Sequence, residues 1–359
     1  MNNLEEGVSE ALHESVKLFG AIGDGVTDDT KAIQSAIDNV HSQGGGTVYI
    51  PAGTFVITKH LKFYANMTLE GASQEATIIK QTGDEGHLSG TDASNSSIRN
   101  ITFLGMGIDT GTGGVGFGRL NNDNTEALNI MNVTIKDCAS GLSVSTPITS
   151  TFTNVRVQGI ADSAFSFYGS GTSVVMSNCY ALTCTKAGFN LDQLNYSVLL
   201  GCAAEVCGIG YNLTNNCNNV SLIGCGAEDQ IPRGNDYPGV DFQVSGGVGN
   251  SLVSCYSRNN EHAGIILKGS GGTIIMGYRE IGNTDIGLQG DENVTGLTLV
   301  GNNISGSVTL HPGTISMTGP TSSRPTNALY EGLSFYDTTL KKVTYYTGSG
   351  WVDAIGAAV

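Results

Sequence analysis

Short runs of alternating hydrophobic and polar residues recur along most of this chain with a regular period. From Asn132 onward, successive units begin 22, 24, 23, 23, 30 and 23 residues apart. Each unit holds an Asn, Gly or Ser turn, a short apolar strand, a variable corner and a second strand. That second strand recurs as GLSV, AFSF, GFNL, GYNL, GVDF and GIIL. Such period-two alternation predicts strands with one buried and one exposed side.

The repeat predicts an all-β solenoid. No helix of 10–12 residues separates the strands, which excludes a doubly wound βαβ sheet. Parallel strands of adjacent coils lie roughly 4.8 Å apart, so equivalent side chains should form columns along the axis. Asn132, Asn154 and Asn178 share one register and predict an asparagine ladder at a turn, with side chains bonding to turn backbone as the simpler alternative. Roughly ten coils would make a rod about 45–50 Å long.

The N-terminal part predicts a helical cap instead of a coil. A helix is expected over residues 28–40, where Asp28 and Asp29 favour its N-terminus. The triple glycine 44–46 ends it, and a strand follows. An open solenoid end exposes apolar core and unpaired strand, so a covering helix is expected there. Its apolar face is formed by Ala32, Ile33, Ala36, Ile37 and Val40.

The run FGAIGDGVTDDTKAIQSAI…GGGTVYIPAGTFVI resembles the start of the pectate-lyase-like superfamily domain, which polygalacturonase-like enzymes and many bacteriophage tailspikes share. The resemblance is strong over residues 18–80 and continues as looser repeat similarity to about residue 310. It implies a single-stranded right-handed parallel β-helix, often trimeric in phage proteins, that acts on polysaccharides. The matched segment carries none of the family's catalytic residues.

The tail from Ser322 differs from the repeat and holds the only tryptophan, Trp351. It predicts a small β-meander, which is too small to be stable alone. It resembles a short module that ends many tail-fibre and tail proteins of phages and prophages. The module could clamp an oligomer or present Trp351 to a sugar, and clamping is favoured because aromatic area is common at subunit interfaces.

These features divide the chain into an N-terminal arm (1–17), a capping helix with the first coil (18–70), a parallel β-helix (71–318) and a C-terminal β module (319–359). The N-terminus lacks the apolar core of a secretory signal peptide, and no apolar run approaches the roughly 20 residues of a membrane span. We expect a protein made in the host cytoplasm without a signal peptide and located in the virion, in a phage tail.

The charge balance limits the classes of molecule that the protein is expected to bind. Seventeen Lys and Arg stand against 32 Asp and Glu, a formal net charge of −15. Nucleic acid is excluded because phosphate neutralisation needs clustered cations. A polyanionic substrate would be repelled at long range unless local cations intervened, whereas neutral or amino-sugar glycans meet no such barrier.

Neither the cysteines of the chain nor the acidic residues near its N-terminus predict a metal site. No CxxC pair exists, which argues against zinc. Asp24, Asp28 and Asp29 could suggest Ca²⁺, but capping is favoured, so no cofactor is expected. The cysteines recur mostly at the coil spacing and predict two interior columns, one of Cys179, Cys202, Cys225 and Cys255 and one of Cys138, Cys184 and Cys207.

Carboxylates are the main candidates for chemistry, since no P-loop, GxSxG, HExxH or EF-hand pattern occurs. Glu205 and Glu228 hold the same position in consecutive coils, which predicts a separation on the order of 5 Å. Retaining glycosidases hold their two carboxyl groups at about 5–5.5 Å. Arg258 follows in the same column and could counter the charge. The alternative is that both glutamates simply face solvent at a corner.

The long insertion at residues 229–238 lies beside this pair, and insertions in solenoids are often functional loops. Asp241 directly follows it and is the third catalytic candidate. An outward column of polar side chains could form a glycan groove or simply a solvated sheet face. That column is predicted as Ser143, Ser166, Asn190, Asn212, Asp241, Ile266 and Gln289. The candidate substrate-binding residues are Asp229, Tyr237, Arg258, His262, Asn190 and Asn212.

Together these features favour a phage or prophage tailspike-type receptor-binding protein that recognises and depolymerises a bacterial surface polysaccharide, by hydrolysis rather than elimination. Three alternatives stay open: a binding-only tail fibre, a free polysaccharide hydrolase or lyase, and a purely structural virion part. The expected partners are the polysaccharide, further copies of the chain in a homotrimer and other phage tail proteins, without nucleic acid and without membrane insertion.

Overall fold

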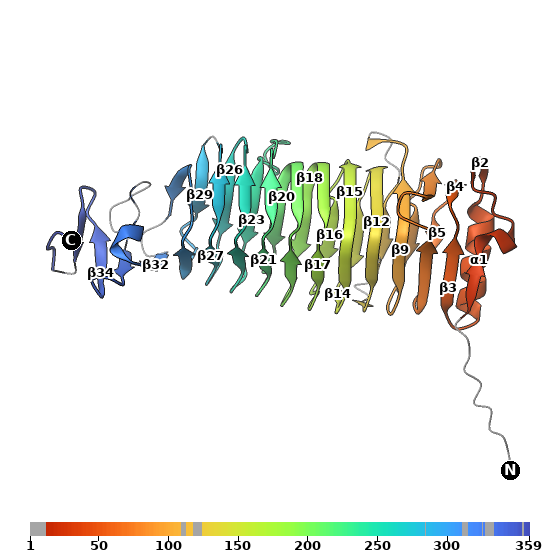
Figure 1. The fold of residues 1–359 in the computed structure, drawn as a ribbon, viewed down its shortest axis with the longest axis horizontal. Coiled ribbons are helices and arrows are strands. Elements are labelled where there is room, and N and C mark those ends of the chain that lie inside the picture. The colour runs from red at the N-terminus through yellow and green to blue at the C-terminus, as the bar shows by residue number, and fades with distance from the viewer. Residues whose placement is uncertain are drawn as a thin grey trace, which may run out of the picture.

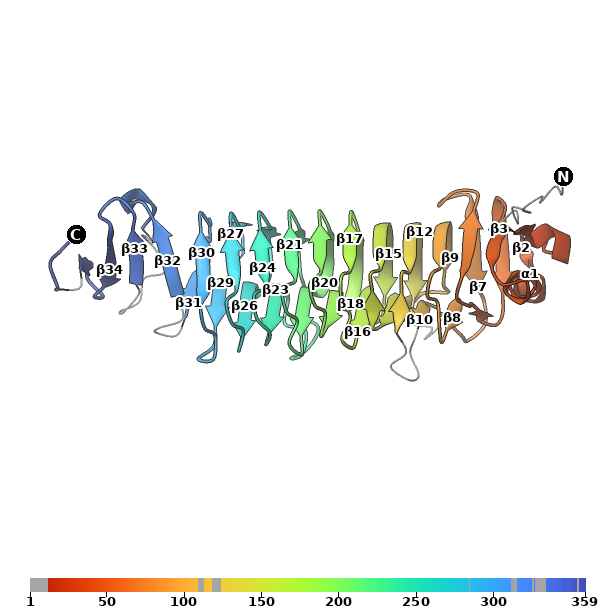
Figure 2. The ribbon, with the colours of Figure 1, turned by 90° about the horizontal axis from the view of Figure 1, so that it is seen from below.

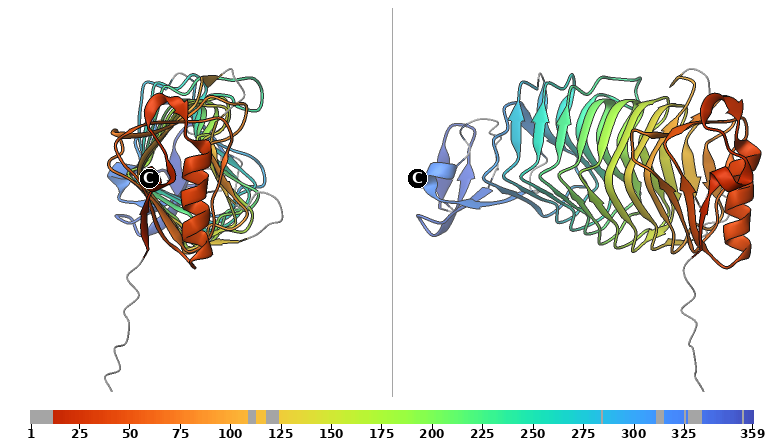
Figure 3. Two further views of the ribbon diagram at one scale, coloured as in Figure 1. Left: turned by 90° about the vertical axis from the view of Figure 1, so that its right-hand side faces the viewer. Right: turned by 45° about the vertical axis from the view of Figure 1, so that its right-hand side comes forward.

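The computed structural model describes residues 12–108, 113–117, 124–283, 285–310, 315–324, 326, 334–353 and 355–359. Parallel strands stack along a rod for about 11 turns, with a helix at one end and the C-terminal strands at the other (Figure 1). Viewed near its axis, the coils superimpose around one central core (Figure 3). The predicted all-β parallel solenoid is confirmed. Most of the predicted N-terminal arm, residues 1–11, lies outside the described residues.

Each coil contributes to three parallel sheets, which we call faces A, B and C. Face A begins with β1 (His13–Ser15), β3 (Gly46–Ile50) and β6 (Met67–Gly71). The first halves of β9 (Ser97–Leu104), β12 (Asn129–Cys138) and β15 (Thr151–Ile160) continue it. It then runs through β17 (Val175–Ser177), β19 (Val198–Leu200), β21 (Ser221–Ile223), β24 (Ser251–Val253), β27 (Ile274–Met276) and β30 (Leu297–Val300).

Face B begins with β2 (Asp24–Asp28), β4 (Gly53–Ile57) and β7 (Thr77–Gln81), and continues through the second halves of β9, β12 and β15. The first halves of β18 (Tyr180–Asp192) and β20 (Ala203–Thr214) follow. Its last strands are β22 (Gly226–Glu228), β25 (Tyr256–Arg258) and β28 (Arg279–Ile281).

Face C begins with β5 (Leu61–Lys62), β8 (Leu88–Gly90), β10 (Val115–Phe117), β13 (Leu142–Ser145) and β16 (Phe165–Tyr168). The second halves of β18 and β20 continue it. It ends with β23 (Val240–Ser245), β26 (Ala263–Lys268), β29 (Ile286–Gly290) and β31 (Ser307–Thr309). A small separate sheet pairs β11 (Thr125–Glu126) with β14 (Pro147–Ile148).

The corner between faces A and B carries the predicted asparagine ladder. Asn154 donates from Nδ2 to Oδ1 of Asn132 over 2.9 Å, and Asn132 donates to Asn100 over 3.1 Å. Asn178 continues the ladder at 3.5 Å. All four residues have φ between 52° and 61°. Asparagine tolerates this left-handed backbone better than most residues, which explains why it recurs at the corner.

The core consists of columns of apolar side chains. Phe165, Phe189, Tyr211 and Phe242 stack face to face with ring centroids 4.7, 4.7 and 5.0 Å apart. All eight cysteines are free and buried, as predicted for interior columns. The coil register pairs Cys184 with Cys207.

Helix α1 (Thr30–Ser42) closes the N-terminal end and confirms the predicted helix with slightly shifted bounds. Its Ile33, Ala36, Ile37 and Val40 are fully buried and belong to the same core as the coils. The short 3₁₀ helix η1 (Val16–Phe19) packs beside it. No described helix is long and apolar enough to cross a membrane.

The N-terminal aspartates have structural roles. Asp28 Oδ1 accepts a hydrogen bond from the backbone N–H of Thr30 at the start of α1. Asp29 instead accepts from the N–H groups of Ile22 and Gly23, at 2.6 and 2.9 Å. The part of the chain that the structure describes contains no group of three or more His, Cys, Asp or Glu arranged to hold a metal.

The C-terminal strands continue face A. β32 (Ile315–Gly319) pairs in parallel with β30 and with β33 (Ser334–Asp337), and η3 (Thr321–Ser323) lies between them in the chain. β33, β34 (Lys342–Tyr346) and β35 (Trp351–Asp353) then pair antiparallel, as expected of a meander. Arg324 forms an ion pair with the fully buried Asp337, at 2.7 Å.

Candidate functional site

The predicted glutamates lie side by side on face B. Glu205 of β20 is in register with Glu228 of β22, and Glu228 is in register with Arg258 of β25. Nη1 of Arg258 lies 3.8 Å from Oε2 of Glu228. Tyr180, one coil before Glu205, lies close to the Glu205 side chain. The predicted stacking of Glu205, Glu228 and Arg258 is therefore present.

The two glutamates have different neighbours, which is what distinct catalytic roles require. Desolvation, with the adjacent Glu205 carboxylate, raises the pKa of Tyr180. The guanidinium of Arg156 also lies over the Tyr180 ring, with Cζ 5.1 Å from the ring centroid. Glu205 thus faces a phenol and Glu228 a half-exposed guanidinium.

Asp241 does not belong to the outward column, and this prediction is wrong. Gln243, and not Asp241, is in register with Asn212. Asp241 is fully buried, and its Oδ2 accepts hydrogen bonds from Ser257 and Asn260 inside the rod. Desolvation raises its pKa well above the ordinary value, and the buried Glu280 raises it further. A carboxyl group in this position is closed to a polysaccharide.

The displacement of Asp241 has two causes. The insertion at residues 229–238 lengthens this coil, so the GVDF motif sits two residues away from the expected register. The strand also bends at the corner between faces B and C, where the consecutive residues Asp241 and Phe242 both face inward. Gly210 occupies the position equivalent to Asp241 in the preceding coil. Because glycine has no side chain, the preceding coil gives no indication of which way a side chain at this position points.

The remaining predicted binding residues divide between two faces. Asp229 directly follows Glu228 at the end of β22, and Tyr237 lies near the end of the insertion with its Cβ packed close to Gly208. Asn190 and Asn212 lie instead on face C, in a ladder continued by Gln243 and Lys268. His262 precedes β26, also a strand of face C. The structure therefore does not gather the predicted set at one point.

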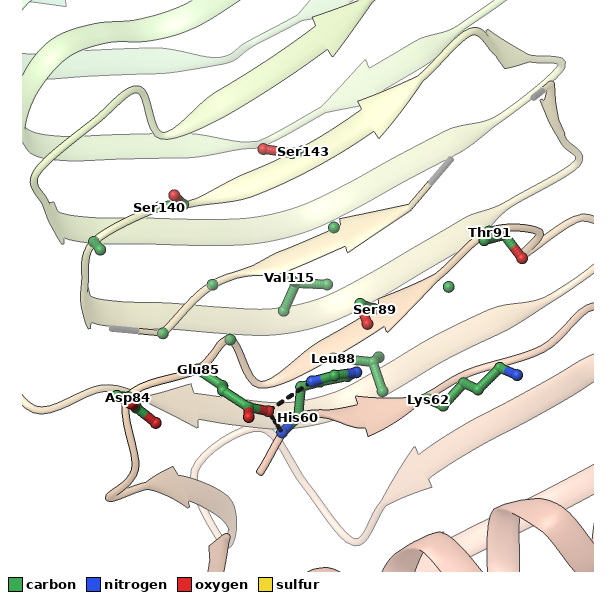
Figure 4. A pocket seen from close by; sticks show the side chains of 16 residues that line it. His60, Lys62, Asp84, Glu85, Leu88, Ser89, Thr91, Val115, Ser140 and Ser143 are labelled. Carbon is green, nitrogen blue, oxygen red and sulfur yellow. Dashed lines mark hydrogen bonds and ion pairs between the residues drawn. The ribbon is translucent and has the colours of Figure 1, made fainter. Parts of the chain in front are cut away.

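A hollow of about 690 Å³ lies on face C near the N-terminal end of the rod (Figure 4). Its wall crosses strands β5, β8, β10 and β13. His60, Glu85 and Lys62 lie along one side, and Ser140 and Ser143 lie across from them (Figure 4). Glycines form much of its floor, which lets a ligand approach the backbone closely. These glycines are Gly86, Gly90, Gly113, Gly114 and Gly116.

His60 and Glu85 form an oriented pair within the hollow. His60 Nδ1 lies 2.7 Å from Glu85 Oε2, and the His60 backbone N–H donates to the same oxygen at 3.0 Å. Lys59 binds the other oxygen at 2.9 Å. These contacts, the backbone bond first, lower the pKa of Glu85 to about 2, so it is a carboxylate at neutral pH. Nε2 of His60 makes no hydrogen bond to any described residue, which leaves it available to a ligand.

A second histidine, His87, supports the floor from inside the rod. It is fully buried, with Nε2 2.8 Å from the carbonyl oxygen of Leu104 and Nδ1 accepting from the N–H of Gly114 at 3.1 Å. These partners require a neutral ring protonated on Nε2. Desolvation lowers the pKa of His87 to about 4. Because Gly114 lines the hollow, His87 holds part of the floor in place.

The repeat pattern does not predict this hollow, because its residues lie in the irregular first coils. One signal was present: His60 and Glu85 are 25 residues apart, close to one coil. A histidine and an acid at that spacing should meet on neighbouring rungs of a solenoid.

Comparison with known proteins gives two kinds of match. The sequence model of the family described as "Rhamnogalacturonase A/epimerase, pectate lyase-like" matches residues 14–212, more than half of the chain. The mannuronan C5-epimerase AlgE1 of Azotobacter vinelandii is 40% identical over 106 residues, which cover 25% of this chain and 8% of that protein.

Two phage proteins are also similar. The preneck appendage protein of Bacillus phage PZA is 28% identical over 224 residues, covering 58% of this chain and 24% of that protein. The enzymatically active domain of tailspike protein 2 of bacteriophage CBA120 has a TM-score of 0.62 at 15% identity, covering 87% of this chain and 48% of that one. This structural match shows a shared fold. The chain spans well under two thirds of the length of each of these three relatives.

Proposed function

Because the chain belongs to the rhamnogalacturonase A/epimerase, pectate lyase-like family, we propose that it binds and chemically modifies a polysaccharide. The names of its relatives support this, since they include a mannuronan epimerase and a phage tailspike. The phage relatives further support a tailspike-type role, in which the protein is carried on a virion and recognises a bacterial surface polysaccharide.

The observation that carries the proposal is the hollow on face C. Its volume of about 690 Å³ falls within the roughly 300–1,000 Å³ of small-ligand sites, enough for a short stretch of sugar units. Serine and threonine side chains and exposed backbone supply hydrogen-bonding groups for sugar hydroxyls. Lys62 supplies a positive charge in a strongly acidic chain, which suits a sugar carboxylate.

The His60–Glu85 pair supplies a base. Glu85 fixes the ring through Nδ1, so Nε2 can accept a proton. In a uronic acid, Nε2 would take the proton from the carbon next to the carboxylate, and the electron pair would pass into that carboxylate beside Lys62. Delivery of a proton from water to the opposite face of that carbon would give an epimer. Breaking the bond to the glycosidic oxygen, which would leave with a proton from water, would instead give an unsaturated end and a cleaved chain.

A second candidate site is the Glu205–Glu228 pair, whose different neighbours favour hydrolysis of a neutral glycan. Tyr180 lies beside one carboxylate and Arg258 beside the other, so the two glutamates could act as acid and nucleophile. The two sites lie at different positions along the rod and on different faces, so substitutions at one site can be distinguished from substitutions at the other.

The test compares wild-type protein with His60→Gln and Glu228→Gln on polymannuronate and on purified bacterial surface polysaccharides. Reducing ends report cleavage, ultraviolet absorbance reports unsaturated ends, and deuterium uptake from heavy water reports proton abstraction. His60→Gln should lose about 10²-fold or more of the activity, while Glu228→Gln keeps it. His13→Gln, an exposed histidine elsewhere, is the control.

Other outcomes are equally informative. Activity lost only in Glu228→Gln would move the site to face B. Full activity in both variants would contradict both sites. Binding of a polysaccharide without any product would contradict the enzymatic part and leave a recognition spike.

A further inference from the structure

Face A is free of charge over most of its length. On the eight strands β12, β15, β17, β19, β21, β24, β27 and β30, each outward residue is aliphatic, methionine, serine, threonine or asparagine. These sixteen positions, which we call the uncharged face, are Asn129, Met131, Thr151, Thr153, Val175, Ser177, Val198, Leu200, Ser221, Ile223, Ser251, Val253, Ile274, Met276, Thr298 and Val300.

The same coils carry charge on another face. Face B carries Arg156 and Arg279 in one outward column and Glu205, Glu228 and Arg258 in the neighbouring outward column. Face A of the earlier coils has Glu70 and Arg99, and these form an ion pair at 2.9 Å. The lack of charge on the later coils therefore distinguishes face A from face B.

Several apolar side chains of the uncharged face are open to solvent. Leu200 is 51% exposed, Met276 42% and Ile223 36%. These three residues occupy one column, continued by Val253 between Ile223 and Met276. Contiguous apolar surface of this extent on a soluble protein usually marks an interaction site.

The C-terminal module extends the same surface. Leu299 and Phe335 are buried, so the next residue in each strand, Val300 in β30 and Tyr336 in β33, lies on the outward side. Tyr336 pairs with Val343, and both are exposed. Strands β21, β24, β27, β30, β32 and β33 lie side by side in one row along the rod (Figure 2).

We propose that the uncharged face, with Tyr336 and Val343, is where copies of this chain associate side by side. Eleven strands from β12 to β34 span about 48 Å, and three-residue strands are about 10 Å long, giving roughly 500 Å² per copy. Two such faces provide about 1,000 Å², the size at which specific interfaces begin.

Charge and repeat identify the partner. A net charge of −15 makes copies repel one another wherever charged faces would meet, and the uncharged face removes that barrier. Its ridges repeat at the rung spacing, so another copy of the same rod matches them along the full length.

The test measures molar mass in solution by light scattering over a range of concentrations. Wild-type protein should have the mass of two or more 37.2 kDa chains. Ile223→Glu combined with Met276→Glu should reduce it to one chain, because buried unpaired carboxylates are costly. Ile281→Glu, a 46% exposed isoleucine on face B, is the matched control and should keep the wild-type mass.

A cross-linking experiment provides a second test of the proposal in case the double variant fails to fold. Ile223→Cys should form disulfide-linked dimers on mild oxidation, and Ile281→Cys should not, while the eight native cysteines are buried. Circular dichroism confirms that each variant is folded. A monomeric wild-type protein, an unchanged mass in the double variant, or equal cross-linking at Ile281→Cys would overturn the proposal.

Discussion

Two buried ionisable side chains, Asp241 and His87, give the protein opposite pH dependences. The pKa of Asp241 is raised by burial, so its stabilising contribution is complete below the ordinary value of 3.8 and is lost as the pH rises toward the folded value. The pKa of His87 is lowered, so its contribution is complete above the ordinary value of 6.5 and is lost as the pH falls toward about 4.

Asp241→Asn should stabilise the protein at neutral pH and leave polysaccharide activity unchanged. The amide keeps the shape of the side chain without the buried charge, and the expected gain is roughly 1–3 kcal/mol. Thermal unfolding at several pH values measures it, and the gain should shrink toward pH 4. Loss of activity in a stably folded variant would contradict the structural role.

His87→Gln should flatten the acid side of the stability profile. The shift from 6.5 to about 4 corresponds to at most about 3 kcal/mol lost between those pH values. Urea unfolding at pH 4.5 and 7.0 tests this, with Asp241→Asn as the comparison because its window runs in the opposite direction. An unchanged pH slope in His87→Gln would contradict the assignment.

At the level of strands and corners, the correct predictions are those that depend only on the repeat period. The asparagine corner, the interior cysteines and the Glu205–Glu228–Arg258 column all follow from a spacing near 23 residues, because a fixed spacing sets the register. Asp241 was misplaced because an insertion and a bend shift the register locally, and no pattern in the sequence marks the bend. The hollow was not predicted because the early coils are irregular, although His60 and Glu85 are separated by close to one coil.

The asparagine ladder should contribute measurably to stability. Asn154→Ala places a β-carbon in left-handed backbone at φ 52° and removes the bond to Asn132, for an expected loss of about 2–3 kcal/mol. Asn154→Gly should lose less, since glycine accepts this backbone. Thr153→Ala, on the same strand, is the control for surface effects in urea unfolding. Equal losses for Ala and Gly would show that backbone strain plays no part.

At the scale of the whole molecule, one repeat produces three faces with different chemistry. Face A lacks charge over eight coils, face B carries arginines and paired glutamates, and face C contains the hollow and an amide ladder. Association through face A would leave faces B and C open to a polysaccharide. The stiff rod would then present equivalent sites from several chains to one surface, which raises avidity without new contacts.

The proposed function requires that a sugar chain bind in the hollow on face C. The most direct measurement is a crystal structure of the wild-type protein with an oligosaccharide of the polymer it binds or cleaves. Density is expected over the glycine floor, with a sugar carbon or hydroxyl near Nε2 of His60 and a polar group near Lys62. Density along Glu205 and Glu228, with the hollow empty, would contradict it.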